Sequence, residues 1–407
     1  MNKGALISKI AILMLVLMLS CLVLGAIGAG AQPAPTNQPA AEKAKVVGSD
    51  LGLQGKLGEA IAKAPAGTGK GQINPDAARG AFGIPGAPKI NYLLAVLWAV
   101  WVGWIFSTVG AFGGIMAGVG HMTIYGLGDY ARSFKQTAPG LNKLLTDSIR
   151  ASNQWLVGLS SLISVINYLK AKRLAWPLGL ALGLGSIVGA FSAAALTGGK
   201  VTFSQYQGWF GLFVFIVGGV LLYETTPRGQ AGKKAAKAAT QAFEKSVREK
   251  KGEAEEGINI LSWGLTNIKF SFFGVEFKFN PVWAFIGGIV IAAISAFIGV
   301  GGGFLYVPYL TSIVGLPMFV VAGTSAMAVF VSMLTGITTY IKVAGAAMDW
   351  MMIGVELIGI FIGSMIGPRT QKYIPEIWLK RLFVVLALYV GLGYFSKGFF
   401  GNSWVPM

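Results

Sequence analysis

The chain has 407 residues, of which 54% are hydrophobic and only 12% are charged. Its mean hydropathy is +0.64, which is typical of a polytopic membrane protein and excludes an ordinary soluble domain. The net charge of +17 comes from basic residues that flank apolar segments, so it does not indicate a nucleic-acid partner. One cysteine and one histidine exclude a disulfide framework and argue against a metal site, and we expect no cofactor.

The N-terminal part divides at about residue 31. Residues 1–31 combine a basic start, a long apolar run and an Ala29-Gly-Ala31 pattern. They predict a secretory signal peptide, with an uncleaved N-terminal anchor as the alternative. Residues 32–89 are rich in Ala, Gly, Pro and Lys and predict a low-complexity extracytoplasmic tail that is mostly disordered or loosely helical, with one short amphipathic helix within Leu51–Ala64.

Residues 90–223 form the first predicted transmembrane repeat. It begins with a long apolar stretch, Ile90–Leu127, which Gly110-Ala-Phe-Gly-Gly114 interrupts. Glycine costs about 1 kcal/mol relative to alanine inside a helix, so this stretch predicts a broken helix. A polar insertion, Asp129–Arg150, follows, and three apolar spans come after it, at about residues 152–169, 174–196 and 207–223.

Residues 224–280 form a charged linker that we place in the cytoplasm. Its first part, up to about Glu256, is rich in Ala, Lys and Glu and predicts a helix. Phe270–Phe279 alternates between large apolar and other residues, which predicts either a short β-hairpin or an interfacial segment.

Residues 281–407 form the second predicted repeat. Its first stretch, Val282–Ile313, contains Gly299-Val-Gly-Gly-Gly303, and spans follow at about residues 319–341, 350–366 and 379–397. A membrane tolerates non-helical backbone only where it is buried in protein or lines a watery cavity. We therefore expect a substrate site at these glycines.

The two halves share a pattern in the same order. Tyr168-Leu-Lys170 matches Tyr340-Ile-Lys342, Ser152-Asn153 matches Thr324-Ser325, and the two glycine runs correspond. Internal symmetry of this kind is typical of transporters.

The positions of the basic loops suggest how the halves cross the membrane. Basic loops on the same side of the membrane must be joined by an even number of spans, and this holds if each glycine-broken stretch is a re-entrant hairpin. The repeats are then inverted, and Met407 lies outside. The alternative is that each broken stretch crosses once, which gives parallel repeats. The predicted fold is an all-α polytopic membrane protein with two internal repeats, each with a glycine-broken, re-entrant helix plus three transmembrane helices.

The second half carries a specific set of motifs. They are Gly299-Val-Gly-Gly-Gly303 with Val307-Pro308, then Ala322-Gly-Thr-Ser325, then Met348-Asp-Trp350. Over about Pro281–Phe399 the chain resembles the TauE/SafE sulfite exporter family. The first half departs from the family pattern at Phe112, Val119 and Ser152-Asn153. The resemblance implies transport of small sulfur-containing or organic anions, such as sulfite and sulfonates, coupled to an ion gradient.

An anion inside a membrane needs hydrogen-bond donors without many full charges, and helix N-termini and hydroxyl groups supply them. A helix that restarts near Phe304 would provide one such terminus, and Thr324 would either contact the anion or only cap the next helix. We expect Gly301–Phe304 with Thr324 and Ser325 to be the stronger half of the site. The candidate substrate-binding residues are Gly299, Gly301, Gly302, Gly303, Phe304, Thr324, Ser325, Gly113, Gly114, Ser152 and Asn153.

Three further residues are candidates for coupling or gating: Glu356, Arg150 and His121. Each also has a structural alternative: an interfacial or paired carboxylate for Glu356, a membrane-edge anchor for Arg150 and a packed or interfacial histidine for His121. Other glycines follow the spacing that lets membrane helices approach closely, namely Gly185, Gly189, Gly359, Gly363 and Gly367.

The leading functional hypothesis is a secondary transporter of a small anion in the cell (plasma or inner) membrane, with multiple spans and no enzymatic activity. A passive anion channel is one alternative, and a membrane scaffold that binds a partner through residues 32–89 is another. Besides the substrate and the lipid bilayer, we expect a proton or a sodium ion as a coupling partner and allow for a homo-oligomer.

Overall fold

The computed structural model describes residues 53, 55–109, 113–230, 234–248, 257–298 and 303–406. The predicted signal peptide and most of both glycine runs lie outside these residues. The described chain is mostly helical. Six of its helices are long and apolar enough to cross a membrane: Trp176–Thr197, Phe203–Tyr223, Pro281–Ile298, Met318–Ala344, Trp350–Gln371 and Ile377–Phe399.

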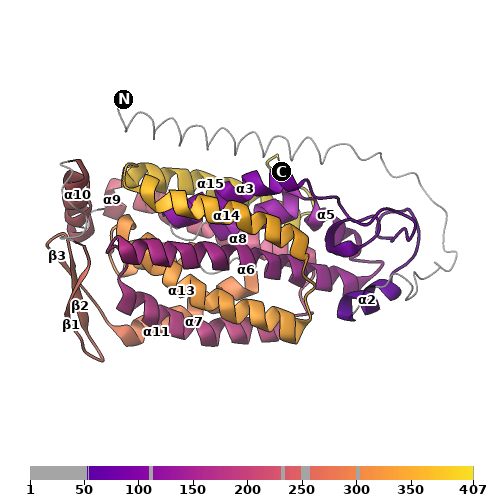
Figure 1. Cartoon of the computed structure of the whole chain (residues 1–407), viewed down its shortest axis with the longest axis horizontal. Coiled ribbons are helices and arrows are strands. Elements are labelled where there is room, and N and C mark those ends of the chain that lie inside the picture. Colours follow the sequence, from indigo (N-terminus) through magenta and orange to yellow (C-terminus); the bar gives the residue numbers. More distant parts are fainter. Residues whose placement is uncertain are drawn as a thin grey trace.

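The helices lie roughly parallel in one bundle (Figure 1). The first half contains α3 (Tyr92–Val109), α4 (Gly113–Val119), the π-helix η2 (Gly120–Ile124), α5 (Leu127–Ser133), α6 (Pro139–Lys170), α7 (Trp176–Thr197) and α8 (Phe203–Glu224). The second half contains α11 (Pro281–Ile298), α12 (Gly303–Pro308), η3 (Tyr309–Ile313), α13 (Met318–Thr339), η4 (Tyr340–Ala344), α14 (Trp350–Gln371) and α15 (Glu376–Phe399).

Both glycine-broken stretches fold back on themselves. In the first, the Trp98 indole on α3 donates a hydrogen bond to the Met116 carbonyl on α4 at 3.0 Å. A Cβ on Gly113 would lie 2.5 Å from the Cβ of Phe106, so α4 runs back alongside α3. In the second, the Tyr309 hydroxyl of η3 lies 3.4 Å from the Trp283 carbonyl near the start of α11.

Each large helix–helix contact has an equivalent contact that the corresponding helices of the other half make. Helix α3 packs against α14 as α11 packs against α7, and α6 packs against α14 as α13 packs against α7. The remaining large contacts join equivalent helices, α6 to α13 and α8 to α15. The two halves therefore use the same packing scheme.

Glycines make two of these close contacts possible. A Cβ on Gly189 of α7 would lie 2.1 Å from the Ile289 carbonyl oxygen of α11, and one on Gly363 of α14 would lie 2.0 Å from the Val100 carbonyl oxygen of α3. Gly185, Gly359 and Gly367 are as tightly enclosed. The prediction that these five glycines serve close helix packing is confirmed.

A small folded unit lies at one end of the bundle, which we call the sheet end (Figure 1). It contains α9 (Pro227–Gln230), α10 (Lys234–Arg248) and an antiparallel sheet of β1 (Asn259–Ser262), β2 (Ile268–Phe272) and β3 (Val275–Phe279). Of the two structures predicted for Phe270–Phe279, the hairpin is correct, and its turn uses positive φ at Phe273 and Gly274. The sheet is the one addition to the all-α prediction.

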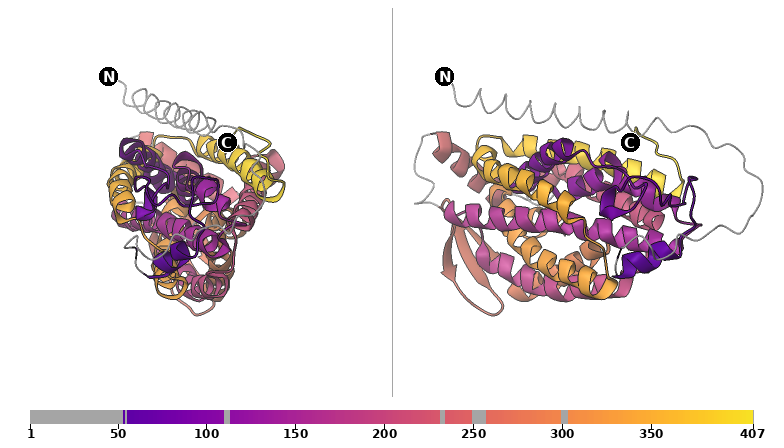
Figure 2. Two further views of the ribbon diagram at one scale, coloured as in Figure 1. Left: turned by 90° about the vertical axis from the view of Figure 1, so that its right-hand side faces the viewer. Right: turned by 45° about the vertical axis from the view of Figure 1, so that its right-hand side comes forward.

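The opposite end carries a cap formed by residues 55–91 (Figure 2). It contains α2 (Gly55–Ala62) and the 3₁₀ turn η1 (Ala81–Gly83), and it buries Ile61, Ile73 and Ile84. The Lys56 ammonium donates to the carbonyls of Val343 and Ala344, each at 3.1 Å. The helix predicted within Leu51–Ala64 is therefore present, but the predicted disorder is wrong for residues 55–89, because their few large apolar side chains dock on the bundle.

Helix α6 corrects a second prediction. The polar stretch before Arg150 is not a separate insertion, because α6 begins at Pro139 and continues for 32 residues to Lys170. Proline at the first helical position marks this start. The helix is too polar to count among the six apolar spans, yet it lies inside the bundle and buries a series of polar side chains: Asp147, Ser148, Arg150, Ser152, Asn153, Gln154, Ser160, Ser161 and Ser164.

Candidate functional site

Arg150 on α6 binds the last carbonyls of α11, which we call the α11 end. Its guanidinium donates to the carbonyl of Ala296 at 3.0 Å and also to that of Phe297. The Tyr340 hydroxyl donates to the same Ala296 carbonyl at 2.8 Å. Carbonyls at a helix C-terminus lack partners within the helix, and a cation satisfies both their hydrogen bonds and their partial negative charge. Arg150 is therefore a helix cap, not a membrane-edge anchor.

Arg150 is itself held in place by an ion pair within α6. It donates to Asp147 at 2.9 Å, and both side chains are at most 1% exposed. The second carboxylate oxygen of Asp147 accepts a hydrogen bond from the Gly199 amide at 2.6 Å. The Tyr340 ring lies 4.7 Å from the guanidinium carbon of Arg150, which adds a cation–π contact.

The last carbonyls of α3, which we call the α3 end, are satisfied in an equivalent way. The Tyr168 hydroxyl contacts the Ser107 carbonyl, and the Gln371 amide donates to the Thr108 carbonyl at 2.8 Å. Arg173 donates to the Gln371 side chain at 3.1 Å and stacks over the Tyr168 ring. Tyr168 and Tyr340, which match in the two halves of the sequence, thus have the same structural role.

A buried histidine–carboxylate pair joins the two halves between these ends. His121 of η2 lies 3.1 Å from the Glu356 carboxylate of α14, and the two side chains are 0% and 1% exposed. The other ring nitrogen of His121, Nδ1, contacts the side-chain oxygen of Asn153 on α6. Glu356 is therefore a buried, paired carboxylate, and two of the three coupling candidates are in direct contact.

Asn153 belongs to a group of three consecutive side chains in which most polar atoms lack partners. Within the described part of the chain, no hydrogen bond is made by the Ser152 hydroxyl, the Asn153 amide nitrogen or either polar atom of Gln154, although all three side chains are fully buried. The Tyr206 hydroxyl of α8 lies near Asn153 without a well-formed hydrogen bond. Buried polar groups without a partner cost about 1–3 kcal/mol each, so such a cluster indicates a place for a ligand.

Thr324 and Ser325 differ from these counterparts in the first half. Thr324 does not cap α13, because the helix begins six residues earlier, at Met318. Its hydroxyl instead accepts a hydrogen bond from the Ala175 amide at 3.1 Å, and the Ser325 hydroxyl donates to the Ala322 carbonyl at 3.3 Å. Both hydroxyls are buried and already serve the backbone.

The structure separates the predicted site residues along the bundle. Thr324 follows Gly323, which packs against Tyr168, and Tyr168 lies 15 residues after Asn153 on α6, or about 22 Å at 1.5 Å per residue. Gly113 and Gly114 begin α4 near the α3 end, while Gly303 and Phe304 begin α12, and all four are buried. Gly299, Gly301 and Gly302 lie outside the described residues. Thr324 and Ser325 therefore lie far from Ser152 and Asn153 along the bundle, whereas α4 and α12 contact each other.

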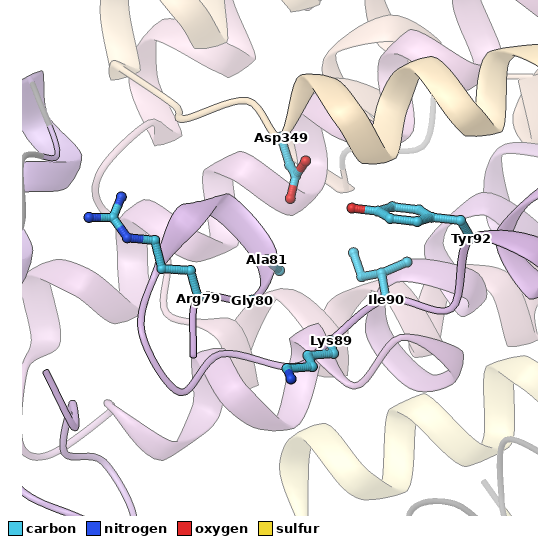
Figure 3. Close-up of a pocket in the computed structure, with 7 residues that line it drawn as sticks. All are labelled: Arg79, Gly80, Ala81, Lys89, Ile90, Tyr92 and Asp349. Atoms are coloured by element: carbon cyan, nitrogen blue, oxygen red, sulfur yellow. The ribbon is translucent and has the colours of Figure 1, made fainter. Parts of the chain in front are cut away.

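A cavity of about 220 Å³ opens between the cap and the start of α14 (Figure 3). Arg79 and Lys89 of the cap contribute cationic side chains, and Tyr92 and Asp349 line the other side. Asp349 also N-caps α14 through the Met352 amide at 3.0 Å and accepts from the Phe82 amide at 2.9 Å. This cavity lies two helical turns before Glu356 along α14.

Comparisons with known proteins agree with this architecture. The sulfite exporter TauE/SafE family matches residues 94–394 of the chain. The chain belongs to this family of membrane transporters. The protein is thus a multi-pass integral membrane protein, as six apolar helices also indicate. It is 21% identical over 316 residues, covering 76% of this chain and 100% of the relative, to a protein of Bacillus subtilis (strain 168) called probable membrane transporter protein YunE. No solved structure matches the chain.

Sequence reasoning missed three residues of this site. Gln154 and Tyr206 were not among the candidates, although Gln154 directly follows Asn153. Gly336 of α13 gave no functional signal either, yet a Cβ there would lie 2.4 Å from the Gln154 side-chain oxygen. Gly336 and Gln154 belong to different helices, so their contact could not be predicted from spacing in the sequence.

Proposed function

We propose that this family member is a secondary transporter of a small anion, most specifically a sulfur-containing one such as sulfite or an organosulfonate. The observation that carries the proposal is the buried group at Ser152–Gln154, in which the Ser152 hydroxyl, the Asn153 amide nitrogen and both polar atoms of Gln154 have no partner in the described chain. Hydroxyl and amide groups donate hydrogen bonds without adding a charge. They suit an anion that must bind in a low-dielectric interior and leave again.

The position of Arg150 supports this choice of site. The guanidinium already binds Asp147 and the α11 end, so it stabilises the architecture one helical turn from Asn153 without serving as a free anion ligand. An anion held by neutral donors near such a fixed cation gains attraction and keeps a manageable dissociation rate. Family membership and the name of the Bacillus subtilis relative are consistent with transport, and the sulfur-containing substrate is our own extension.

For the membrane topology, we propose inverted repeats in the plasma (inner) membrane with the sheet end in the cytoplasm. Lys170, Lys172 and Arg173 lie at that end, because the Ile258 amide donates to the Lys172 carbonyl and Arg173 packs on Phe243 of α10. Arg173 also bonds the Pro368 carbonyl, so Arg369 and Lys372 at the end of α14 lie there too, as the positive-inside rule requires for cytoplasmic loops. The hairpin α3–α4 then enters from the cap side and α11–α12 from the sheet side. A reporter fused after Met407 tests this topology, because inverted repeats place that end outside.

The transport proposal is tested by counterflow in proteoliposomes with labelled sulfite, thiosulfate and a short alkyl sulfonate. We expect uptake of at least one of them, and we expect Ser152→Ala and Asn153→Leu to reduce it. Ser161→Ala is the matched control, because the Ser161 hydroxyl is equally buried but bonded to the Gly158 carbonyl at 2.8 Å. Absence of any sulfur-anion flux under every gradient would exclude this substrate class, and equal flux in Ser152→Ala and the control would exclude this site.

A further inference from the structure

The only histidine of the sequence, His121, lies between the buried carboxylate of Glu356 and Asn153 of the proposed anion site. His121 and Glu356 are buried, 3.1 Å apart, and come from different halves of the chain. Ionisable side chains inside a membrane protein are costly, and where they occur they commonly form proton relays. His121 also belongs to a π-helix, η2, a distortion that is frequent at functional sites.

The contacts of His121 fix how many protons the pair holds at rest. An amide oxygen only accepts hydrogen bonds, so the contact with the Asn153 oxygen requires a hydrogen on Nδ1. The contact between Nε2 and the Glu356 carboxylate then requires one further proton, on either atom. With that one proton the pair has no net charge, and with a second proton it has a charge of +1.

We infer that the His121–Glu356 pair is a proton-coupling site, which takes up one proton when a monovalent anion binds next to it at Asn153. This inference rests on the proposed anion transport. The proton comes from water and is released again when the anion leaves, so one anion and one proton move together without net charge. A negative charge beside Asn153 favours the doubly protonated pair, because opposite charges attract strongly in a low-dielectric interior.

Few other ionisable groups near His121 compete for this role. On η2 the Tyr125 ring packs edge-on against His121 at 5.5 Å. From α8 the Tyr206 phenol reaches Asn153, and from α15 the Tyr394 phenol bonds Thr123 at 2.8 Å. The remaining carboxylates, Asp147 and Asp349, are committed to Arg150 and to backbone amides. Glu356 is therefore the carboxylate that can change its protonation with the least structural loss.

Its depth also suits proton exchange with the cap side. Glu356 lies six residues after the start of α14 at Trp350 and 15 residues before its end at Gln371, or about 9 Å and 22 Å along the axis. The cavity beside Asp349 lies at the nearer end. A proton entering there has the shorter path to the pair.

The test uses the full chain in proteoliposomes with an imposed pH difference of one unit and no membrane potential. Labelled sulfite and labelled methanesulfonate are the probes, because methanesulfonate stays ionised and carries no proton itself. Protein-free liposomes correct for passive movement of sulfurous acid. For one proton per anion, the wild type should accumulate the anion about tenfold on the alkaline side, and a lumenal pH dye should report the proton.

Glu356→Gln and His121→Gln should lose the accumulation, so that the ratio falls to about 1, while anion-for-anion exchange stays within about threefold of wild type. Retained exchange shows that these variants are folded. Glu276→Gln, which changes an exposed carboxylate on β3, is the matched control and should accumulate as the wild type does.

Two outcomes would overturn the inference alone: transport in the wild type without proton movement, or full proton-driven accumulation in Glu356→Gln. If Glu356→Gln also loses exchange, the inference is tested by the dye signal of the wild type and by Glu356→Asp. Both should move protons together with the anion, and absence of that movement would contradict the inference. If the wild type moves neither probe, the proposed function itself fails and this inference falls with it.

Discussion

The α11 end and the α3 end are built alike but have different surroundings. At each, a tyrosine hydroxyl contacts one of the last carbonyls of the helix, Tyr340 at α11 and Tyr168 at α3. Arg150 donates directly to the carbonyls of α11, whereas Arg173 donates to Gln371, whose amide in turn donates to a carbonyl of α3. Near the α3 end, Thr324 is bonded to the backbone. Near the α11 end, the matching Ser152 is not bonded within the described chain. One half thus uses its polar groups for stability, and the other leaves them available for a ligand.

The largest expected effect separates the two arginines. Arg150→Leu leaves Asp147 buried without its cation and should lower the free energy of unfolding by about 3–5 kcal/mol. Arg173→Leu removes hydrogen bonds to neutral partners, Gln371 and the Pro368 carbonyl, and should cost about 1.5–3 kcal/mol. Denaturant titration in detergent micelles measures both. Equal losses would mean that the two ends are not energetically different.

The next effect tests whether the broken helices pack equivalently. Gly189→Ala and Gly363→Ala each push a Cβ into a backbone oxygen, so both should destabilise by about 1–3 kcal/mol. Gly354→Ala on α14 has nothing within 4 Å of the new Cβ and serves as the control, with no loss expected. A large effect at only one of the two buried glycines would contradict equivalent packing. The same denaturant titration applies.

A smaller effect concerns the tyrosine hydroxyls. Tyr168→Phe should cost about 1–2 kcal/mol, since it removes contacts with the Ser107 carbonyl and with Gln371, the latter at 2.7 Å. Tyr340→Phe should cost less, about 1 kcal/mol, because Arg150 still satisfies Ala296. Thermal unfolding of the two variants side by side gives the ranking. The reverse order would show that Arg150 does not substitute for Tyr340.

The smallest expected effect distinguishes ligand binding from stability. Ser152→Ala should weaken substrate binding about three- to tenfold and leave stability nearly unchanged, because the hydroxyl has no described partner to lose. Thr324→Val should do the opposite, with a loss of about 1 kcal/mol of stability and unchanged affinity. Ligand-induced thermal shifts report both quantities in one experiment. Weaker substrate binding in Thr324→Val would indicate that the substrate binds near the α3 end instead.

Local patterns in the sequence predicted much of this fold. Glycines spaced by four residues, such as Gly185 and Gly189, lie on one helix face, so their packing role follows from spacing alone. The glycine runs correctly marked where α3 and α11 are interrupted. The proline at the start of α6 was an equally local signal. The polar residues after Pro139 nevertheless suggested a loop, because the burial of this helix depends on its neighbours and not on its own sequence.

The central polar contacts could not be predicted in the same way. His121 and Glu356 are 235 residues apart, and no periodicity links residues in different halves. The short distance in sequence from Trp350 suggested an interfacial Glu356, but its carboxylate is buried and contacts His121 of η2. The cap itself was missed because its small residues suggest disorder until the bundle supplies the surface on which Ile61, Ile73 and Ile84 pack.

The docking of the cap also has a consequence for biosynthesis. Phe82 bonds to Asp349, which is 267 residues later in the chain. At about 5–20 residues per second, a ribosome needs roughly 15–50 s to make the intervening segment. During that time the cap has neither the Asp349 carboxylate nor the carbonyls bonded by Lys56, and it can contact only the first half, chiefly α6. Docking of the cap onto α14 is therefore a late step of assembly, because it requires that α14 of the second half has been made.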